Sequence, residues 1–417
     1  MEEFSYRGGD LYCEDVPLSA LADTYGTPVY VYSQSSIVKR FAALEAAYAD
    51  VPHLICYALK ANDNLAIAGI LAGQGAGVDI VSGGELFKAR RAGFPGSRVI
   101  FAGVGKTREE IAYALDEGVL LFNVESPAEI ESIAAVAAEK GVVARISVRV
   151  NPDVDPQTHP YISTGLKKSK FGVPADQVVE MYRRAKVHPN LEPVGIQMHI
   201  GSQLVHVRPI VDAVQRVLEL VDTLHREGID LRYFDVGGGL GIRYNDENPE
   251  GPSDLTGQIL PLLRERGLTV VCEPGRFIVG NSGALLAQVI YTKSNGAKKF
   301  VIVDAAMNDL IRPSLYDAFH DIRPLTETDG ANRATEVVDV VGPICESGDF
   351  FAHARDLPVC EAGDRLAIMS AGAYGFAMAS NYNARPRTAE VLVNRGEHRL
   401  VRRRETYQDL IRAEEGL

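Results

Sequence analysis

The sequence predicts a (β/α)8 barrel of the TIM type, joined to a C-terminal, mostly antiparallel β domain. Short apolar runs alternate with amphipathic segments of helical length eight times, over about 220 residues. From about Gly280 onward this helical periodicity fades, and β-branched runs separated by turn residues replace it. An open, doubly wound parallel sheet is the alternative, because it would show the same alternation.

The barrel elements follow one another in a regular order. A strand-like run, Pro28–Tyr32, comes first and is followed by a helical stretch from Ser35 to about Tyr48. Eight short apolar runs are the expected barrel strands: Leu54–Ala58, Gly77–Val81, Arg98–Phe101, Val119–Phe122, Ala144–Val150, Gly195–His199, Tyr233–Val236 and Thr269–Cys272. Amphipathic segments between them are the expected helices: Leu65–Leu71, Gly83–Ala92, Arg108–Glu117, Pro127–Lys140, Asp176–Val187, Pro209–Glu227 and Leu255–Glu265.

The remaining residues predict a second domain built from strands. Its expected strands are Ala287–Thr292, Phe300–Asp304, Thr335–Val341, Arg365–Ile368, Ala389–Val393 and Arg399–Arg402. We expect the early Pro28–Tyr32 strand to join them, so that residues 36–279 form the barrel and residues 1–35 and 280–417 form a β domain that completes the active site. The tail from Arg402 mixes charges and predicts a solvated terminal helix.

Composition excludes several classes of function. A formal net charge of −12 argues against nucleic acid and anionic membrane surfaces as partners. No apolar run reaches the ~18 residues that a membrane span requires, and the acidic N-terminus does not resemble a secretory signal. The five cysteines are odd in number and none forms a CxxC pair, which favours reduced thiols in the cytoplasm and no metal site.

Lys60 is the first candidate for chemistry. The apolar strand Leu54–Ala58 leads almost directly to this lysine, and polar residues follow it. We expect its amine to be desolvated, which lowers a lysine's pKa and favours imine formation with a carbonyl. The alternative is a strand-end lysine that extends its ammonium to solvent.

Polar or glycine residues follow most of the expected barrel strands, where (β/α)8 barrels carry their active sites. They are Lys60, Asp79, Gly103, Asn123, Arg149, His199, Gly237–Gly239 and Glu273. A purely structural barrel gives no reason for this pattern. Taken singly, Asp79 could instead cap the following helix, and His199 could be a satisfied core histidine.

The chain near strands seven and eight predicts a phosphate site. The run Gly237-Gly238-Gly239 follows strand seven, and glycines let backbone N–H groups approach an anion closely. Gly275, after strand eight, can complete the cradle. Glu273 points toward the barrel mouth, although an ion pair with Arg149 or Arg276 is its alternative role. A lysine, a phosphate cradle and a carboxylate together indicate pyridoxal 5'-phosphate.

Several motifs together resemble the fold-type III pyridoxal-phosphate-dependent decarboxylases over nearly the whole chain. The motifs are Tyr57-Ala58-Leu59-Lys60-Ala61-Asn62, Ser82-Gly83-Gly84-Glu85-Leu86, His199-Ile200-Gly201-Ser202-Gln203, Gly237–Gly241, Glu273-Pro274-Gly275-Arg276, Gly342-Pro343-Ile344-Cys345-Glu346-Ser347 and Gly372-Ala373-Tyr374-Gly375. The resemblance implies that Lys60 holds the cofactor as an imine, His199 stacks on its ring and Glu273 binds its ring nitrogen. It also implies further cofactor contacts from Asp79, Arg149, Ser202, Gly239, Gly275, Arg276 and Tyr374.

The same resemblance implies how a substrate binds. Arg276, Arg312 and Tyr316 would hold a substrate carboxylate, with Tyr374 nearby, and Glu346 would bind the distal ammonium. Cys345 and Glu346 would enter the site from a second subunit, so the resemblance implies a homodimer with shared active sites. Cys345 would donate the proton to the carbanion. From the residues alone, Cys345 could instead be a buried small hydrophobe.

The implied reaction is the decarboxylation of meso-2,6-diaminoheptanedioate to L-lysine and CO2, the last step of lysine biosynthesis. Decarboxylation of ornithine, arginine or carboxynorspermidine is the nearest alternative, although those substrates would leave the second carboxylate clamp unused. Amino-acid racemases of this architecture place an arginine where Glu273 stands, and a non-catalytic cofactor carrier would leave the β domain unexplained. We also predict a substrate loop at Asn151–Phe171, with Lys167, Lys168 and Lys170.

Overall fold

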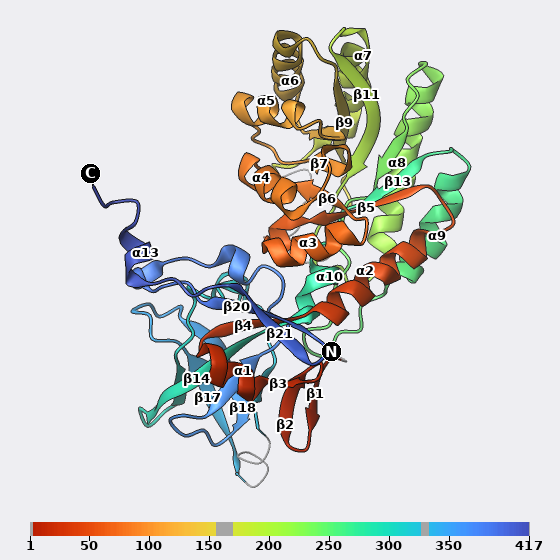
Figure 1. The fold of residues 1–417 in the computed structure, drawn as a ribbon. Helices are drawn as coiled ribbons and strands as arrows, with labels where there is room; N and C mark the ends of the chain where they lie inside the picture. The colour runs from red at the N-terminus through yellow and green to blue at the C-terminus, as the bar shows by residue number, and fades with distance from the viewer. Residues whose placement is uncertain (1–2, 156–169, 327–332, 417) are drawn as a thin grey trace. The chain divides into compact units, whose positions relative to one another are not determined.

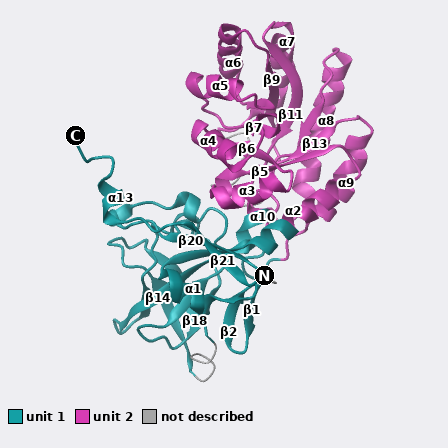
Figure 2. Ribbon diagram, viewed as in Figure 1, with its two compact units in different colours: residues 1–39, 243–247, 278–417 teal, residues 40–242, 248–277 magenta. Residues whose placement is uncertain are grey.

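The chain folds into two compact units. The structure, a computed structural model, describes residues 3–155, 170–326 and 333–416. The barrel unit comprises residues 40–242 and 248–277, and the β unit comprises residues 1–39, 243–247 and 278–417 (Figure 2). The central part of the expected substrate loop, residues 156–169 with Lys167 and Lys168, lies outside the described residues, so that loop stays a prediction.

Eight parallel strands close into a ring in the barrel unit. Each strand pairs with its neighbours in chain order, and the last pairs with the first, with Val271 opposite Leu54. The strands are β5 (His53–Ala58), β6 (Gly77–Ile80), β7 (Val99–Phe101), β8 (Leu121–Val124), β9 (Ala144–Asn151), β11 (Leu191–Met198), β12 (Tyr233–Asp235) and β13 (Thr269–Cys272). A short strand, β10 (Val173–Pro174), adds to β9. The closed ring confirms the predicted barrel and excludes the open sheet.

Helices surround these strands (Figure 1). They are α2 (Gln34–Tyr48), α3 (Leu65–Gly73), α4 (Gly83–Ala92), α5 (Arg108–Asp116), α6 (Pro127–Lys140), α7 (Ala175–Val187), α8 (Arg208–Arg226) and α9 (Pro252–Arg264). Local sequence explains their ends. Ser126 caps α6 by accepting the Glu129 N–H, Pro127 occupies the first turn, and Gly141 ends the helix at φ +66°. Thr107 and Glu110 form a capping box at the start of α5.

The β unit is built around β14 (Gly283–Ser294). The strand β4 (Val29–Ser33) lies between β14, to which it is antiparallel, and β20 (Ala389–Asn394), to which it is parallel. The early strand therefore joins the β domain, as predicted. The other strands are β15 (Lys299–Val303), β16 (Ile322–Pro324), β17 (Thr335–Val341), β18 (Phe350–Pro358), β19 (Arg365–Ile368), β20 (Ala389–Asn394) and β21 (Glu397–Arg402).

The core of the β unit lies between this sheet and the N-terminal elements. Those elements are β1 (Phe4–Arg7), β2 (Asp10–Cys13), β3 (Val16–Pro17) and α1 (Leu18–Tyr25). Leu21, Val31, Leu286 and Val391 are fully buried in one cluster there. Each such side chain contributes about 1.5–3 kcal/mol through burial, so the N-terminal residues are an integral part of this unit.

Several features differ from the sequence-based expectation, and short elements such as β10 and β16 were not expected. The strand β18 was missed because His353, Arg355 and Asp356 interrupt its apolar pattern, while pairing with β17 supplies its hydrogen bonds. The elements β1–β3 and α1 were also missed, because each is short. Finally, the expected tail helix is only α13 (Tyr407–Ile411), whereas Arg402 ends β21, in agreement with the expected strand Arg399–Arg402.

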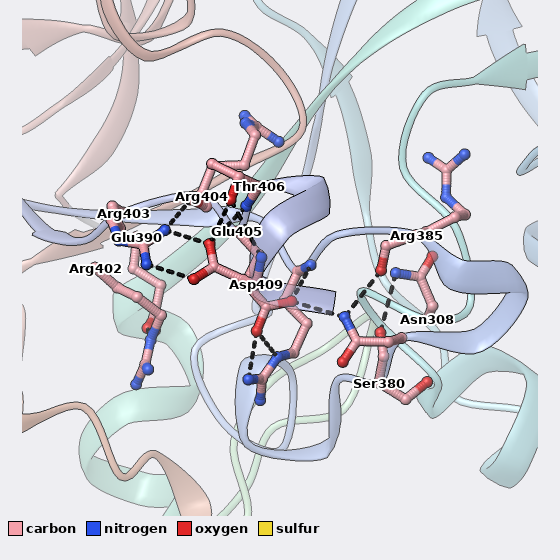
Figure 3. Close-up of polar contacts among 12 residues, drawn as sticks. Asn308, Ser380, Arg385, Glu390, Arg402, Arg403, Arg404, Glu405, Thr406 and Asp409 are labelled. Carbon is pink, nitrogen blue, oxygen red and sulfur yellow. Dashed lines mark hydrogen bonds and ion pairs between the residues drawn. The ribbon is translucent and has the colours of Figure 1, made fainter. Parts of the chain in front are cut away.

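The C-terminal segment makes many polar contacts with its surroundings. Figure 3 shows Arg403 paired with Asp409, at 2.5 Å, near Glu405. The Glu405 carboxylate accepts hydrogen bonds from Asn381 (2.7 Å) and from the Arg387 backbone N–H (2.8 Å). The segment therefore holds the loop that follows residue 380. No helix among the described residues is long and apolar enough to cross a membrane.

Candidate active site

Lys60 lies just beyond the C-terminal end of β5, in the turn Leu59–Ala61. Its Nζ donates to Asp79 Oδ2 on β6 at 2.7 Å. The Asp79 side chain is fully buried, whereas 40% of the Lys60 side chain is exposed. The lysine is therefore less desolvated than expected, and its ammonium has a carboxylate partner. The proposed capping role for Asp79 is wrong, because Ser82 caps α4.

The Tyr57–Asn64 segment holds this turn in place. Tyr57 is buried, and its hydroxyl donates to the Asn62 carbonyl at 2.8 Å. Asn64 then caps α3 by accepting the Ala66 N–H at 2.9 Å. Both contacts come from side chains within a few residues of Lys60, so the local sequence places the lysine at the barrel mouth.

A buried carboxyl pair lies inside the barrel. Asn123 Nδ2 donates to Glu273, just after β13, and to Asp235 on β12, at 3.3 Å each. Gln197 Nε2 lies 3.4 Å from both Glu273 oxygens. Burial, the Asp235 carboxylate and the more distant Asp79 raise the pKa of Glu273 well above its usual range. Burial raises the pKa of Asp235 to about 6. The pair therefore binds protons readily.

Arg149 pairs with Glu125 and not with Glu273. Its Nη1 donates to Glu125 Oε1 at 3.0 Å, and both side chains are buried. Glu125 Oε2 also accepts the Gly172 N–H at 2.9 Å, and the guanidinium lies 4.8 Å from the Phe171 ring centroid. Arg276 Nη2 donates to Ser202 Oγ at 3.1 Å. The alternative role of Glu273, an ion pair with Arg149 or Arg276, is therefore wrong.

The glycine run packs tightly against neighbouring strand ends. A Cβ on Gly238 would lie 2.2 Å from the Glu273 carbonyl oxygen, and one on Gly239, at φ +118°, would lie 2.6 Å from that of Gly201. Only glycine fits at either position. Among the described residues, nothing accepts a hydrogen bond from the backbone N–H of Gly239 or Gly275. With Ser202 and Arg276 in the same unit, these donors suit an anion such as phosphate.

His199 follows β11 and lies beside the glycine run. Its Nδ1 accepts the Gly238 N–H at 3.2 Å, which leaves the hydrogen of the neutral ring on Nε2. Burial, followed by the nearby cations Arg149 and Lys60, lowers the pKa of His199 well below its usual range. The ring is therefore neutral at physiological pH.

The β unit carries the other expected site residues. Arg312 is buried at the start of α11 (Arg312–Tyr316), and Tyr316 at its end is partly exposed. Tyr374 lies in the loop after β19 at φ +56°. In this unit, Arg312 contacts His320, Cys345 contacts Asn383, and Glu346 contacts Tyr382.

Cys345 and Glu346 lie between β17 and β18, and both are exposed. The alternative interpretation of Cys345 as a buried hydrophobe is therefore wrong. Asn383 Oδ1 accepts the Cys345 N–H at 3.0 Å, and the Tyr382 hydroxyl donates to Glu346 Oε2 at 3.2 Å. These two contacts hold the exposed pair in a defined position.

Sequence reasoning missed Glu125, Gln197, Asp235 and His320. A signal existed for the first three, because successive inward positions on a barrel strand are two residues apart. Glu125 follows Asn123, Gln197 precedes His199, and Asp235 precedes Gly237 at that spacing. His320 lies in a loop and shows no such pattern.

Comparisons with known proteins agree with this geometry. A family model described as "Pyridoxal-dependent decarboxylase, pyridoxal binding domain" matches residues 34–280. The diaminopimelate decarboxylase of Pseudomonas aeruginosa is 53% identical over 414 residues, which cover 99% of each chain. The solved diaminopimelate decarboxylase of Helicobacter pylori, complexed with L-lysine, is similar with a TM-score of 0.92 and 47% identity, covering 96% of this chain and 100% of that one. The solved diaminopimelate decarboxylase from m. jannaschii, in co-complex with L-lysine, has a TM-score of 0.94 and 37% identity, covering 100% of this chain and 98% of that one.

Proposed function

Since this chain belongs to the diaminopimelate decarboxylase family of pyridoxal-dependent decarboxylases, we propose that it converts meso-2,6-diaminoheptanedioate to L-lysine and CO2, the last step of lysine biosynthesis. The observation that carries the proposal lies in the barrel unit. There, an accessible lysine amine, unused backbone N–H donors and a buried, proton-binding carboxyl follow the ends of strands in one barrel.

The barrel residues fit pyridoxal 5'-phosphate. The phosphate would accept hydrogen bonds from the Gly239 and Gly275 N–H groups and from Ser202 and Arg276, with Tyr374 as a further contact. Inside the barrel, Asp79 Oδ1 and Asn123 Oδ1 are buried polar atoms without a hydrogen-bond partner among the described residues, which suits a site that receives a polar ligand. When bound, the cofactor supplies an electron sink for the electrons of the bond that breaks.

Each remaining barrel residue has a distinct role toward that ligand. Lys60 would hold it covalently through Nζ. Glu273 would hold a proton at the ring nitrogen, which its raised pKa favours. His199, as a neutral imidazole, would pack on the ring face. Asp79 and Arg149 would orient the groups around it.

The substrate would be recognised through both of its ends. Arg276, Arg312 and Tyr316 would bind the carboxylate that remains in the product, since guanidinium groups bind carboxylates with paired hydrogen bonds. Glu346, with Tyr374, would bind at the distal amino group. A substrate without this second carboxylate would leave buried Arg312 unused, which favours meso-2,6-diaminoheptanedioate over ornithine or arginine.

The proposal includes a homodimer in the cytoplasm. Cys345 would deliver the proton to the substrate carbon after CO2 leaves, and both Cys345 and Glu346 would serve the site of the second subunit. Their exposure supports this role, because a site residue that faces solvent in one chain can be covered by another. The formal net charge of −12 and the reduced cysteines suit a cytoplasmic enzyme.

The test is CO2 release by the purified, cofactor-loaded protein. The substrates are meso- and L,L-diaminopimelate, L-lysine, L-ornithine and L-arginine. Release from the meso isomer alone, with L-lysine formed, is the expected result. Release from ornithine or arginine instead would keep the cofactor and the fold, but would overturn the roles of Arg312, Tyr316 and Glu346.

A further inference from the structure

Arg312 is held by a histidine in the β unit. Its Nη1 lies 2.8 Å from His320 Nε2, and His320 is completely buried. The other ring nitrogen of His320, Nδ1, lies 2.8 Å from the Met369 carbonyl oxygen. Arginine usually meets carboxylates in protein interiors, so a histidine partner requires an explanation.

The two contacts determine the protonation of His320. A carbonyl oxygen only accepts hydrogen bonds, so Nδ1 must carry a hydrogen. A guanidinium only donates, so Nε2 must offer a lone pair. Both conditions are met only by the neutral ring protonated on Nδ1. His320 therefore links the Arg312 guanidinium to the Met369 carbonyl through a neutral ring.

Further contacts fix the histidine and the arginine relative to each other. The guanidinium carbon of Arg312 lies 4.7 Å from the Tyr244 ring centroid. The His320 ring packs edge-on against the same tyrosine, with the two ring centroids 5.5 Å apart and an angle of 80° between the ring planes. The backbone of His320 is also held, because Arg355 Nη1 donates to its carbonyl at 2.8 Å. A hydrogen bond and an aromatic face thus orient one guanidinium.

We propose that His320 is a positioning residue, which orients the Arg312 guanidinium for the substrate carboxylate. This inference rests on the proposed function, in which Arg312 binds the carboxylate retained in the product. Without His320, the Arg312 side chain would have to become ordered when the substrate binds. That loss of rotamer freedom would weaken the affinity for the substrate. The effect should fall on substrate and product binding and leave the chemical step nearly unchanged.

Two amide variants separate the two ring nitrogens. In His320→Gln, the side-chain oxygen can take the place of Nε2 and accept from Arg312. In His320→Asn, the shorter amide can replace Nδ1 as the donor to Met369 but ends short of Arg312. We expect H320N to raise KM for meso-diaminopimelate by about 10-fold to 100-fold, the effect of losing a hydrogen bond to a charged group. Its kcat should stay within about threefold.

The Gln variant should recover most of this loss, and the Kd of L-lysine should change in parallel with KM. His398→Asn, at an exposed histidine of the same unit that contacts the Tyr25 hydroxyl, is the matched control and should keep the wild-type KM. Melting temperatures of all three variants are measured beside the kinetics. Equal KM values for H320N and wild type, or equal defects in H320N and H320Q, would overturn the positioning role.

The same experiment tests the role of His320 separately from the proposed function. Turnover of meso-diaminopimelate by wild type, with an unchanged KM in H320N, would overturn only the role of His320. No turnover by wild type would overturn the proposed function, and the inference with it. A loss of kcat in H320N at constant KM would also reject positioning, because it would place His320 in the chemical step.

Discussion

The two units hold a buried arginine in opposite ways. In the barrel unit, Arg149 donates to the Glu125 carboxylate at 3.0 Å, so the two charges cancel. In the β unit, Arg312 donates to the imidazole of His320 at 2.8 Å, which carries no charge. An ion pair of the first kind neutralises charge as it orders the site, whereas the imidazole contact of the second kind orients the guanidinium through a neutral hydrogen bond.

The same contrast extends to the neighbouring groups. In the barrel unit, Lys60 pairs with Asp79, and the carboxyls of Glu273 and Asp235 share a buried, polar interior. These groups set where protons reside. In the β unit, Arg312 and Glu346 are each held by an uncharged side chain, His320 and Tyr382. We therefore expect barrel variants to affect chemistry and stability, and β-unit variants to affect substrate binding.

The largest expected effect is that of Lys60→Ala. It removes the amine that would attach the cofactor, so turnover should fall by at least about 10³-fold. The visible absorbance band of the cofactor-loaded protein should disappear as well. Lys140→Ala, at a surface lysine paired with Asp116, is the control and should retain both. An intact band in K60A would show that another amine holds the cofactor.

Glu125→Gln should have the next largest effect, on stability. The substitution leaves the buried Arg149 charge without its anion, which costs about 3–5 kcal/mol of the free energy of unfolding. Urea denaturation measures this loss. Glu227→Gln breaks the exposed pair with Arg183 and should cost no more than about 1 kcal/mol. A loss under about 1 kcal/mol in E125Q would mean that the buried Arg149–Glu125 pair contributes no more stability than an exposed ion pair. Arg149 and Arg312 would then not differ in the way proposed.

The smallest expected effect concerns the pH dependence of stability in the cofactor-free protein. A carboxyl whose folded pKa is raised contributes stability that is fully present below its unfolded pKa and is lost as pH rises through the folded pKa. The folded pKa of Asp235 is about 6, against 3.8 in the unfolded chain. Between pH 4 and pH 7, wild type should therefore lose about 2 kcal/mol more than Asp235→Asn, at 1.36 kcal/mol per pKa unit.

Urea unfolding of both cofactor-free proteins across this pH range tests the prediction. The amide oxygen that D235N introduces can still accept the Gly237 N–H, as the Asp235 carboxylate does at 2.9 Å, so the fold should persist. Parallel stability curves for the two proteins would mean that Asp235 does not hold an extra proton in the folded protein. The Asp235 carboxyl would then be ionised in the folded barrel, as Glu125 is beside Arg149.

Much of the fold could be predicted from local patterns. The alternation of apolar runs and amphipathic segments identified all eight barrel strands. Both ends of α6 also follow from local sequence, because Ser126 and Pro127 start the helix and Gly141 ends it. The strand β18 could not be predicted, because its His353, Arg355 and Asp356 hide the apolar pattern and pairing with β17 alone defines it. Secondary structure that depends on a distant partner leaves a weak local signal.

For the candidate site, too, the sequence predicts some features and only the folded structure shows the others. Residue type and position next to apolar strands were enough to predict Lys60, Asp79, His199 and Glu273 as site residues, since parallel strands end at one face of a barrel. Only the folded chain shows that Glu125 pairs with Arg149 and that His320 meets Arg312. Hydrogen-bond partners and pKa values depend on distance and burial, and residues far apart in sequence acquire both only when the chain folds.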